Sequence, residues 1–376
     1  MPSPLFTLRP ARSASGALLC ALALGLTACA GQPEADRAAV ASTGAGSGQA
    51  KAPDPTPSSS SPAPATRAPA TKAPRTGGGP ATLAFAGDVH FEGSSAAALS
   101  GRIGSAYRVL RGADLAVVNL ETAVTDRGTP QPKEFLFRAP ARAFGMLERA
   151  GIDAVSIANN HGMDYGRVGL ADTLEAARAA GMPLLGAGQD DVAAWTPLRR
   201  EVNGVRVSVL AATDVLDDFA RTSWLAGPNT PGLASAKDPA RLLAGVRAER
   251  ASADIVVVFL HWGQERVVCP TARQRELGKM LADAGADIVV GSHAHVVQPG
   301  GTAGKALVRY GLGNFQFYAA GGPGSNSGVL TVRVDRGGVT GSTWHPATIV
   351  GGAPMLLNGQ AAAARRAAET ARFASC

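Results

Sequence analysis

The chain has 376 residues, of which 45% are hydrophobic and 17% are charged, and its formal net charge at pH 7 is +7. This length is enough for one large domain or two small ones. Residues 1–79 carry +4 of the charge, and the rest contains no run of lysine and arginine with interleaved aromatics, so we do not expect nucleic acid as a partner. A weakly basic domain still suits an anionic substrate.

The first 28 residues have the features of an export signal. Arg9 and Arg12 precede an apolar run at 16–26, and small residues follow before a cut site. The run is too short for a permanent membrane-spanning helix. The stretch LTAC, which ends at Cys29, resembles the lipobox of bacterial lipoproteins. That resemblance implies a lipid on Cys29, attachment to the cell membrane and exposure on the extracellular face. A plain signal peptide with a coincidental cysteine is the alternative.

Residues 29–79 are expected to form a tether between that anchor and a folded domain at 80–376. The segment is dominated by Ala, Pro, Ser, Thr and Gly and contains no aromatic residue. Such a composition cannot bury enough apolar surface to offset the loss of chain entropy. Frequent proline favours an extended, semi-stiff spacer.

Two of the four cysteines lie in the predicted domain. Cys20 belongs to the export signal and Cys29 is the candidate lipid site, which leaves Cys269 and Cys376. In an exported protein these two either pair or remain unrelated thiols, and the sequence leaves both options open. Neither lies in a Cys-x-x-Cys pattern, so we do not expect thiolate metal ligands.

From residue 82 onward, apolar strands alternate with helical segments that often end at glycine. The strand candidates cover 82–87, 113–119, 152–158, 205–213, 254–261 and 286–293. The helix candidates cover 142–151, 169–181, 238–251 and 273–285. This alternation predicts an α/β fold in which helices cover a sheet.

The C-terminal part has a different pattern. Segments 305–317, 328–335 and 341–350 are expected to be consecutive strands, paired antiparallel. A closing helix is expected over 361–374.

Polar side chains follow five of the predicted strands and include five of the six histidines. They are Asp88 and His90, Asn119 and Glu121, Asn160 and His161, His261, and His293 and His295. Because ligands bind at the carboxyl ends of strands in an α/β sheet, we expect these groups to meet. Alternate residues of an extended segment point the same way, so Asp-x-His and His-x-His are each expected to offer two ligands to one volume.

Imidazole, carboxylate and amide oxygen together suit a divalent first-row metal. Each group also has a simpler interpretation. A single histidine after an apolar strand is usually a hydrogen-bonded structural residue, and the Asn-Asn-His of 159–161 is compatible with a plain turn. Five such groups at five strand ends favour a metal centre.

The ordered motifs GDVH, NLE, NNH, H and GSHAH resemble the calcineurin-type metallophosphoesterase pattern, with Glu121 where that superfamily has a bridging Asp. The forms VVNLET, ANNHGMDYG, FLHWGQE, GADIVVGSHAHVVQ and YGLGNFQF resemble more specifically the CapA family, named for capsule and poly-γ-glutamate synthesis. The likeness covers about 82–330, most of the predicted domain. It implies a four-layer α/β/β/α sandwich of metallophosphoesterase type with metals at one sheet edge.

The resemblance also implies a ligand set for two divalent ions, of Mn, Fe or Zn. One ion would be held by Asp88, His90 and His295, the other by Asn160, His261 and His293, with Glu121 between them. His90 favours a complete two-metal site, whereas Glu121 is one methylene longer than Asp and can favour a single ion.

Five further positions are assigned by the same resemblance or by their place in the motifs. His161 is the expected general acid or hydrogen-bond donor, and Asp164 either orients it or caps a helix. Lys133 and Arg138 either face an anionic substrate or lie in an exposed loop. Glu265 is an orienter of His261 or a substrate contact. The LGNF segment is expected to be a tight turn near the site.

Three functions follow. The first is metal-assisted hydrolysis or transfer on a phosphoester or an anionic polymer such as poly-γ-glutamate, beside membrane proteins of capsule synthesis. The second is a lipoprotein that binds or tethers the polymer without catalysis. The third is a phosphoesterase unrelated to capsule.

Overall fold

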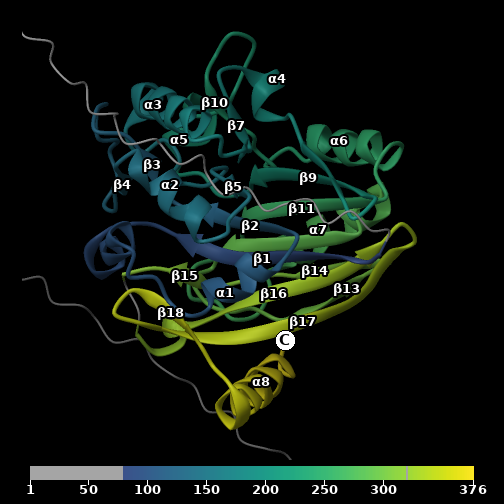
Figure 1. Cartoon of the computed structure of the whole chain (residues 1–376). Coiled ribbons are helices and arrows are strands. Elements are labelled where there is room, and N and C mark those ends of the chain that lie inside the picture. The colour runs from purple at the N-terminus through teal and green to yellow at the C-terminus, as the bar shows by residue number, and fades with distance from the viewer. Residues whose placement is uncertain (1–78, 319–320) are drawn as a thin grey trace, which may run out of the picture. The chain divides into compact units, whose positions relative to one another are not determined.

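The structure is a computed structural model that describes residues 79–318 and 321–376 (Figure 1). The predicted export signal, Cys29 and all of the predicted tether except Gly79 lie outside the described residues. No helix in the described part of the chain has both the length and the apolar character that a membrane crossing requires.

Two large sheets form the centre of the domain (Figure 1). The first has the strand order β18-β17-β16-β1-β2-β5-β6, and β15 pairs with the end of β1. Its strands are β1 (Ala81–Val89), β2 (Leu115–Leu120), β5 (Ala154–Ser156), β6 (Leu184–Leu185), β15 (Asn314–Gln316), β16 (Asn326–Asp335), β17 (Gly338–Val350) and β18 (Ala353–Leu356). The second has the order β13-β14-β12-β11-β9-β8. Its strands are β8 (Leu198–Val202), β9 (Val205–Thr213), β11 (Ile255–Trp262), β12 (Ile288–His293), β13 (Gly300–Ala303) and β14 (Ala306–Arg309).

Helices cover the outer faces of both sheets. Those beside the first sheet are α1 (Tyr107–Gly112), α2 (Arg142–Arg149) and α3 (Gly166–Ala179), and those beside the second are α6 (Ala240–Arg250) and α7 (Ala272–Ala284). Short elements complete the described chain: η1 (Gly93–Ser100), β3 (Ala123–Val124), β4 (Arg138–Ala139), β7 (Ala187–Gly188), α4 (Asp191–Ala194), α5 (Ala220–Ser223), β10 (Gly232–Leu233) and η2 (Gly322–Ser325).

Three apolar clusters separate the four layers. One joins the first sheet to its helices, the second lies between the sheets, and the third joins the second sheet to α6 and α7. Along β11, Val257 faces the other sheet, whereas Val256 and Val258 face the helices. Burial on both faces explains the continuous apolar runs of these strands, and each fully buried valine contributes about 1.5–3 kcal/mol. The α/β/β/α sandwich predicted from the sequence is confirmed.

The end of β1 is irregular. Its pairing with β2 shifts register between Ala86 and Asp88, and its pairing with β15 shifts between Asp88 and Val89. A Cβ atom on Gly87 would lie 1.7 Å from the carbonyl oxygen of Gly313, so only glycine permits this approach of the two chains. Irregular pairing of this kind re-aims the side chains that follow.

The expectation of consecutive antiparallel strands in the C-terminal part is wrong for its first segment. Residues 305–317 divide into β14, which pairs parallel with β12, and β15, which pairs parallel with β1. The segment therefore crosses from the second sheet to the first through Gly311 and Gly313. The β16, β17 and β18 strands are antiparallel, as predicted.

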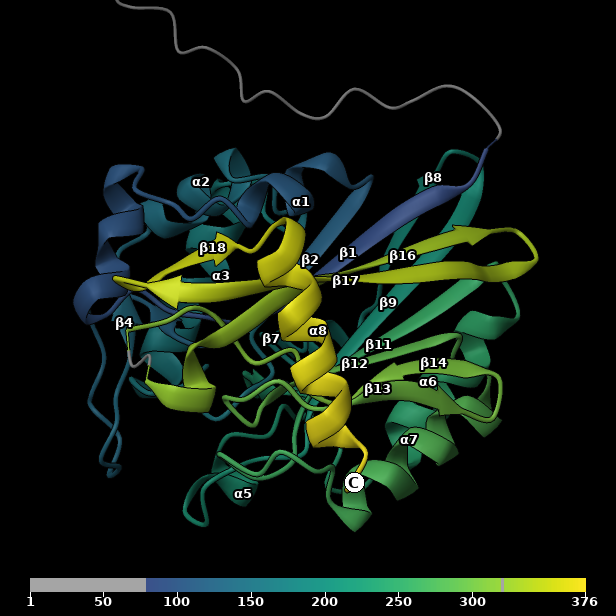
Figure 2. The same cartoon turned by 90° about the horizontal axis from the view of Figure 1, so that it is seen from below.

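The last helix, α8 (Gly359–Phe373), packs on β17. Figure 2 shows α8 running from beside β17 toward β13 and α7. Cys376 forms a disulfide with Cys269, which precedes α7. Of the two options that the sequence left open, the structure has the paired one.

Candidate metal centre

The predicted ligands gather where the parallel strands β1, β2, β5, β11 and β12 end. One ligand atom from each of Glu121, His293 and His295 lies within 4.8 Å of the others. The remaining predicted ligands, except His90, adjoin this group. Asp88 Oδ2 lies 3.3 Å from His295 Nδ1, and His261 Nε2 lies 2.8 Å from Asn160 Oδ1.

Glu121 is the least satisfied group of the centre. Its side chain is fully buried, and neither carboxylate oxygen has a hydrogen-bond partner among the described residues. The imidazole nitrogens nearest its Oε1 are His261 Nε2 at 3.5 Å and His295 Nε2 at 3.7 Å. Burial, together with the nearby Asp88, raises the pKa of Glu121 well above its ordinary value. A buried carboxylate without donors is costly, and a bound cation would remove that cost, so these residues fit a metal ion.

His295 is oriented through its Nδ1 atom. Nδ1 donates to Oδ1 of Asn314 at 2.8 Å, and Asp88 Oδ2 is also near. With Nδ1 held in this way, Nε2 is the nitrogen that can bind a metal. Burial lowers the pKa of His295, but Glu121 and Asp88 overcome this and raise it to about 10. A proton on His295 therefore offsets carboxylate charge until a metal replaces it.

His261 and His293 are both expected to be neutral near pH 7, which suits them as candidate metal ligands. Burial lowers the pKa of both well below the ordinary value, and neutral imidazole is the form that binds metals. His261 Nδ1 lies 3.0 Å from the hydroxyl of Ser292, and His293 Nδ1 is buried without a hydrogen-bond partner in the described chain. His293 and His295 have positive φ angles of 89° and 53°, which are uncommon for non-glycine residues and are one of the strained conformations that cluster at functional sites.

Two asparagines to which we assigned neither a ligand nor a catalytic role connect the parts of the site. Asn119 donates to Asp88 Oδ1 at 2.9 Å, and Asn159 donates to Asn119 Oδ1 at 3.0 Å. Asn159 Oδ1 in turn accepts the backbone N–H of His161 at 2.9 Å. The NLE and NNH motifs contained this signal, because Asn119 lies two residues before Glu121 and Asn159 directly precedes Asn160.

His161 lies beside Asn160 and pairs with Asp164. Its Nδ1 is 2.7 Å from Asp164 Oδ2, which also accepts the backbone N–H of Phe137 at 2.7 Å. Burial lowers the pKa of His161, although Asp164 opposes this. The first turn of α3 is preceded by Tyr165, so Asp164 orients His161 and is not the helix cap.

The family described as bacterial capsule synthesis protein PGA_cap matches residues 82–319. The chain belongs to this family. It is 35% identical over 212 residues to the PGA biosynthesis protein CapA of Bacillus subtilis. This alignment covers 56% of this chain and 54% of that protein. It is 37% identical over 174 residues to the capsule biosynthesis protein CapA of Bacillus anthracis, and this alignment covers 46% of this chain and 41% of that protein. The chain thus spans about half the length of these curated relatives or less.

Among solved structures, a hypothetical protein from Thermus thermophilus aligns with a TM-score of 0.48 at 18% identity. The alignment covers 72% of this chain and all of that one.

The structure does not bring His90 of this PGA_cap chain into the ligand set. Its ring stacks on Phe137 at 4.6 Å and meets the edges of Phe317 and Tyr318. Its Nδ1 accepts the backbone N–H of Glu92 at 3.0 Å. The register shifts in β1 break the strict alternation on which we based the pairing of Asp88 with His90.

The three predicted substrate contacts lie in different settings within the PGA_cap domain. Lys133 is partly buried, and its ammonium group donates to the carbonyl oxygen of Asn160. Arg138 stacks its guanidinium on the Tyr165 ring at 3.6 Å and donates to the carbonyl oxygen of Arg127. Glu265 is exposed and makes no hydrogen bond or ion pair with His261 within the described residues, but its charge raises the pKa of His295.

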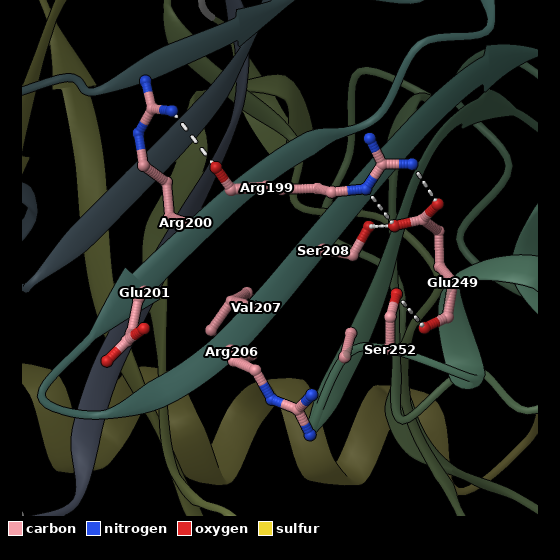
Figure 3. Close-up of a pocket in the computed structure, with 9 residues that line it drawn as sticks. Arg199, Arg200, Glu201, Arg206, Val207, Ser208, Glu249 and Ser252 are labelled. Carbon is pink, nitrogen blue, oxygen red and sulfur yellow. Dashed lines mark hydrogen bonds and ion pairs between the residues drawn. The ribbon is translucent and has the colours of Figure 1, made fainter.

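A surface pocket of the PGA_cap domain lies at the opposite end of the second sheet, where β9 begins (Figure 3). Figure 3 shows Arg199 and the Ser208 hydroxyl both directed at Glu249. Arg206 pairs with Asp254. The charged side chains named here are therefore paired with one another. None of the candidate metal ligands lines this pocket.

Proposed function

We propose that this protein is a membrane-anchored, extracellular accessory protein of capsule or poly-γ-glutamate synthesis that works through a divalent-metal centre. Family membership and the names of the two CapA relatives, which refer to PGA and capsule biosynthesis, support the capsule role. The observation that carries the metal centre is the buried Glu121 carboxylate, which has no hydrogen-bond donor among residues 79–318 and 321–376 and faces imidazoles of His261 and His295.

Six residues form the proposed ligand set for two ions of Mn, Fe or Zn. They are Asp88, Glu121, Asn160, His261, His293 and His295. Bound metals would supply an activated water and polarise a phosphoryl or amide oxygen for hydrolysis or transfer. Asp164 engages Nδ1 of His161, which leaves Nε2 to give a proton to a leaving group. The proposed substrate is an anionic polymer or a phosphoester.

The proposed location follows from the lipobox resemblance. A lipid on Cys29 would hold the chain at the extracellular face of the membrane, and the segment 29–79 would act as the spacer. Membrane proteins of capsule synthesis are the proposed partners.

The test begins with the metal content of the purified full-length protein, measured by mass spectrometry of the elements. We expect Glu121→Gln and His293→Ala to lose bound metal, while His345→Ala, which changes a histidine on β17, keeps it. Unchanged metal content in Glu121→Gln and His293→Ala would refute the centre.

Turnover then separates the functions. Release of product from poly-γ-glutamate or from a generic phosphodiester, lost in His161→Ala, supports catalysis. Metal binding without turnover of either compound supports a polymer-binding role. Turnover of the phosphodiester without any interaction with poly-γ-glutamate supports a phosphoesterase unrelated to capsule.

A further inference from the structure

The ammonium group of Lys133 joins three segments of the chain beside the metal centre. It donates to the carbonyl oxygen of Asn160, lies 3.0 Å from Asp164 Oδ1 and lies 3.4 Å from Asp217 Oδ2. Only 9% of its side chain is exposed. Lys133 therefore has its charge balanced by the protein's own carboxylates before any ligand arrives.

The two carboxylates differ in how firmly they are held. Asp164 is fully buried and also binds His161 Nδ1 and the backbone N–H of Phe137. The side chain of Asp217 is 40% exposed, and within the described residues its Oδ2 has no hydrogen-bond partner in addition to the ion pair with Lys133. Displacing the Asp217 side chain breaks this one ion pair, which an incoming carboxylate would replace at Lys133. Displacing Asp164 would also break its contacts with His161 and Phe137.

We infer that Asp217 occupies a binding subsite for a substrate carboxylate, and that a carboxylate-bearing polymer displaces it to reach Lys133. This inference rests on the proposed function, and it names the substrate class of the same site. The present occupant is itself a carboxylate on a side chain that reaches in from the surface. A polycarboxylate therefore fits the subsite better than a phosphoester does.

The subsite is next to the reacting groups. Lys133 Nζ lies 3.4 Å from His161 Nδ1 and binds the backbone of the candidate ligand Asn160. In a γ-glutamyl polymer, the carbon that bears each α-carboxylate is bonded directly to an amide nitrogen. A carboxylate bound by Lys133 would therefore carry an amide bond toward His161 and the metal ligands.

Asp218 provides a matched control for Asp217. It is the next residue in the chain, its side chain is 90% exposed, and it pairs with Arg221 on the surface. Replacing either aspartate by asparagine changes the net charge equally, but only the change at Asp217 removes a carboxylate from Lys133.

The experiment measures binding of fluorescein-labelled poly-γ-glutamate to full-length protein by fluorescence anisotropy. We expect Asp217→Asn to bind about tenfold more tightly than wild type, which corresponds to about 1.4 kcal/mol. Asp218→Asn should stay within about twofold of wild type, and Lys133→Gln should bind more weakly. Glutarate should displace the labelled polymer at lower concentration than inorganic phosphate.

Three results would overturn the inference: equal effects of Asp217→Asn and Asp218→Asn, weaker binding by Asp217→Asn, or better displacement by phosphate than by glutarate. Asp217→Ala repeats the test with a second side chain. Metal content of the same Asp217→Asn protein should equal that of wild type. If Asp217→Asn and Asp218→Asn bind the polymer equally while their metal content is normal, the subsite alone is rejected. If Glu121→Gln retains its metal, the metal centre alone is rejected.

Discussion

Nδ1 of His295 donates to Oδ1 of Asn314 at 2.8 Å, and the Nδ2 of Asn314 returns a bond to the carbonyl oxygen of His295 at 3.3 Å. Asn314 begins β15 and stands in register with Asp88 of β1. The asparagine of the LGNF segment thus fixes the ring of one candidate ligand while its backbone pairs with the strand that carries another. We expected the LGNF segment to be a tight turn near the site, but Asn314 and Phe315 lie in β15, and the asparagine is an orienting contact for His295.

Replacing Asn314 should weaken metal binding without removing a ligand. We expect Asn314→Leu to lower metal affinity about 10- to 100-fold, because His295 loses the acceptor that fixes its orientation. Competition with a fluorescent chelator measures this affinity. Asn358→Leu, at the surface before α8, is the control and should bind metal like wild type. Wild-type affinity in Asn314→Leu would show that Asp88 alone orients the ring.

The sequence predicted the strands that carry the site because each is buried on both faces and reads as an apolar run. It also predicted that the candidate ligands of these strand ends lie together, since parallel strands place their carboxyl ends at one edge. It failed at His90 because the alternation rule assumes a regular strand, and the contact of Gly87 with Gly313 joins residues far apart in the sequence. Long-range pairing of this kind is invisible in local spacing.

Lys133 shows a second limit of sequence reasoning. The sequence left two options for Lys133, contact with an anionic substrate or an exposed loop, and the structure places its ammonium group beside His161. Asp217 lies in a different loop and faces the same ammonium group. Charge patterns in the sequence could not predict this pair, because it depends on how the two loops meet over the sheet edge.

His90→Phe should keep the metal and change the response to pH. At neutral pH we expect a loss of about 1 kcal/mol in unfolding free energy, because the N–H of Glu92 loses its acceptor. Burial lowers the pKa of His90 below its ordinary value of 6.5, so wild type loses this histidine's contribution as the pH falls below 6.5. The gap between the two proteins should therefore narrow toward acid pH in urea unfolding experiments. Loss of metal in the variant would restore His90 as a ligand.

Metal binding should release a proton from His295. Burial lowers the pKa of this histidine, but Glu121 and Asp88 raise it to about 10, so the metal-free protein carries the proton at pH 8. Nε2 must lose it to bind a metal. Calorimetric titrations in two buffers with different ionisation enthalpies should show about one proton released from this group at pH 8. His295→Asn should release correspondingly less, and an unchanged count would place the proton elsewhere.

Cys29→Ser tests the lipid anchor, which lies outside the described residues. If the LTAC stretch directs lipidation, wild type should be recovered with membranes and should incorporate an alkyne-labelled fatty acid. The variant should lose the label and leave the membrane fraction. Cys20→Ser, within the predicted signal, is the matched control and should behave like wild type. A labelled Cys29→Ser protein would contradict the lipobox interpretation.

The Cys269–Cys376 disulfide should account for much of the stability of the C-terminal helix. Its cysteines are 107 residues apart, and a loop of that size corresponds to about 4–5 kcal/mol of lost chain entropy in the unfolded state. Within α8 only Ala362 and Glu369 are buried, so little apolar contact holds the helix once the bond is absent. The double variant Cys269→Ser, Cys376→Ser should lose unfolding free energy of that order and exchange the amide hydrogens of α8 faster than those of α7. Equal exchange in the two helices would mean that packing on β17 holds α8 without the disulfide.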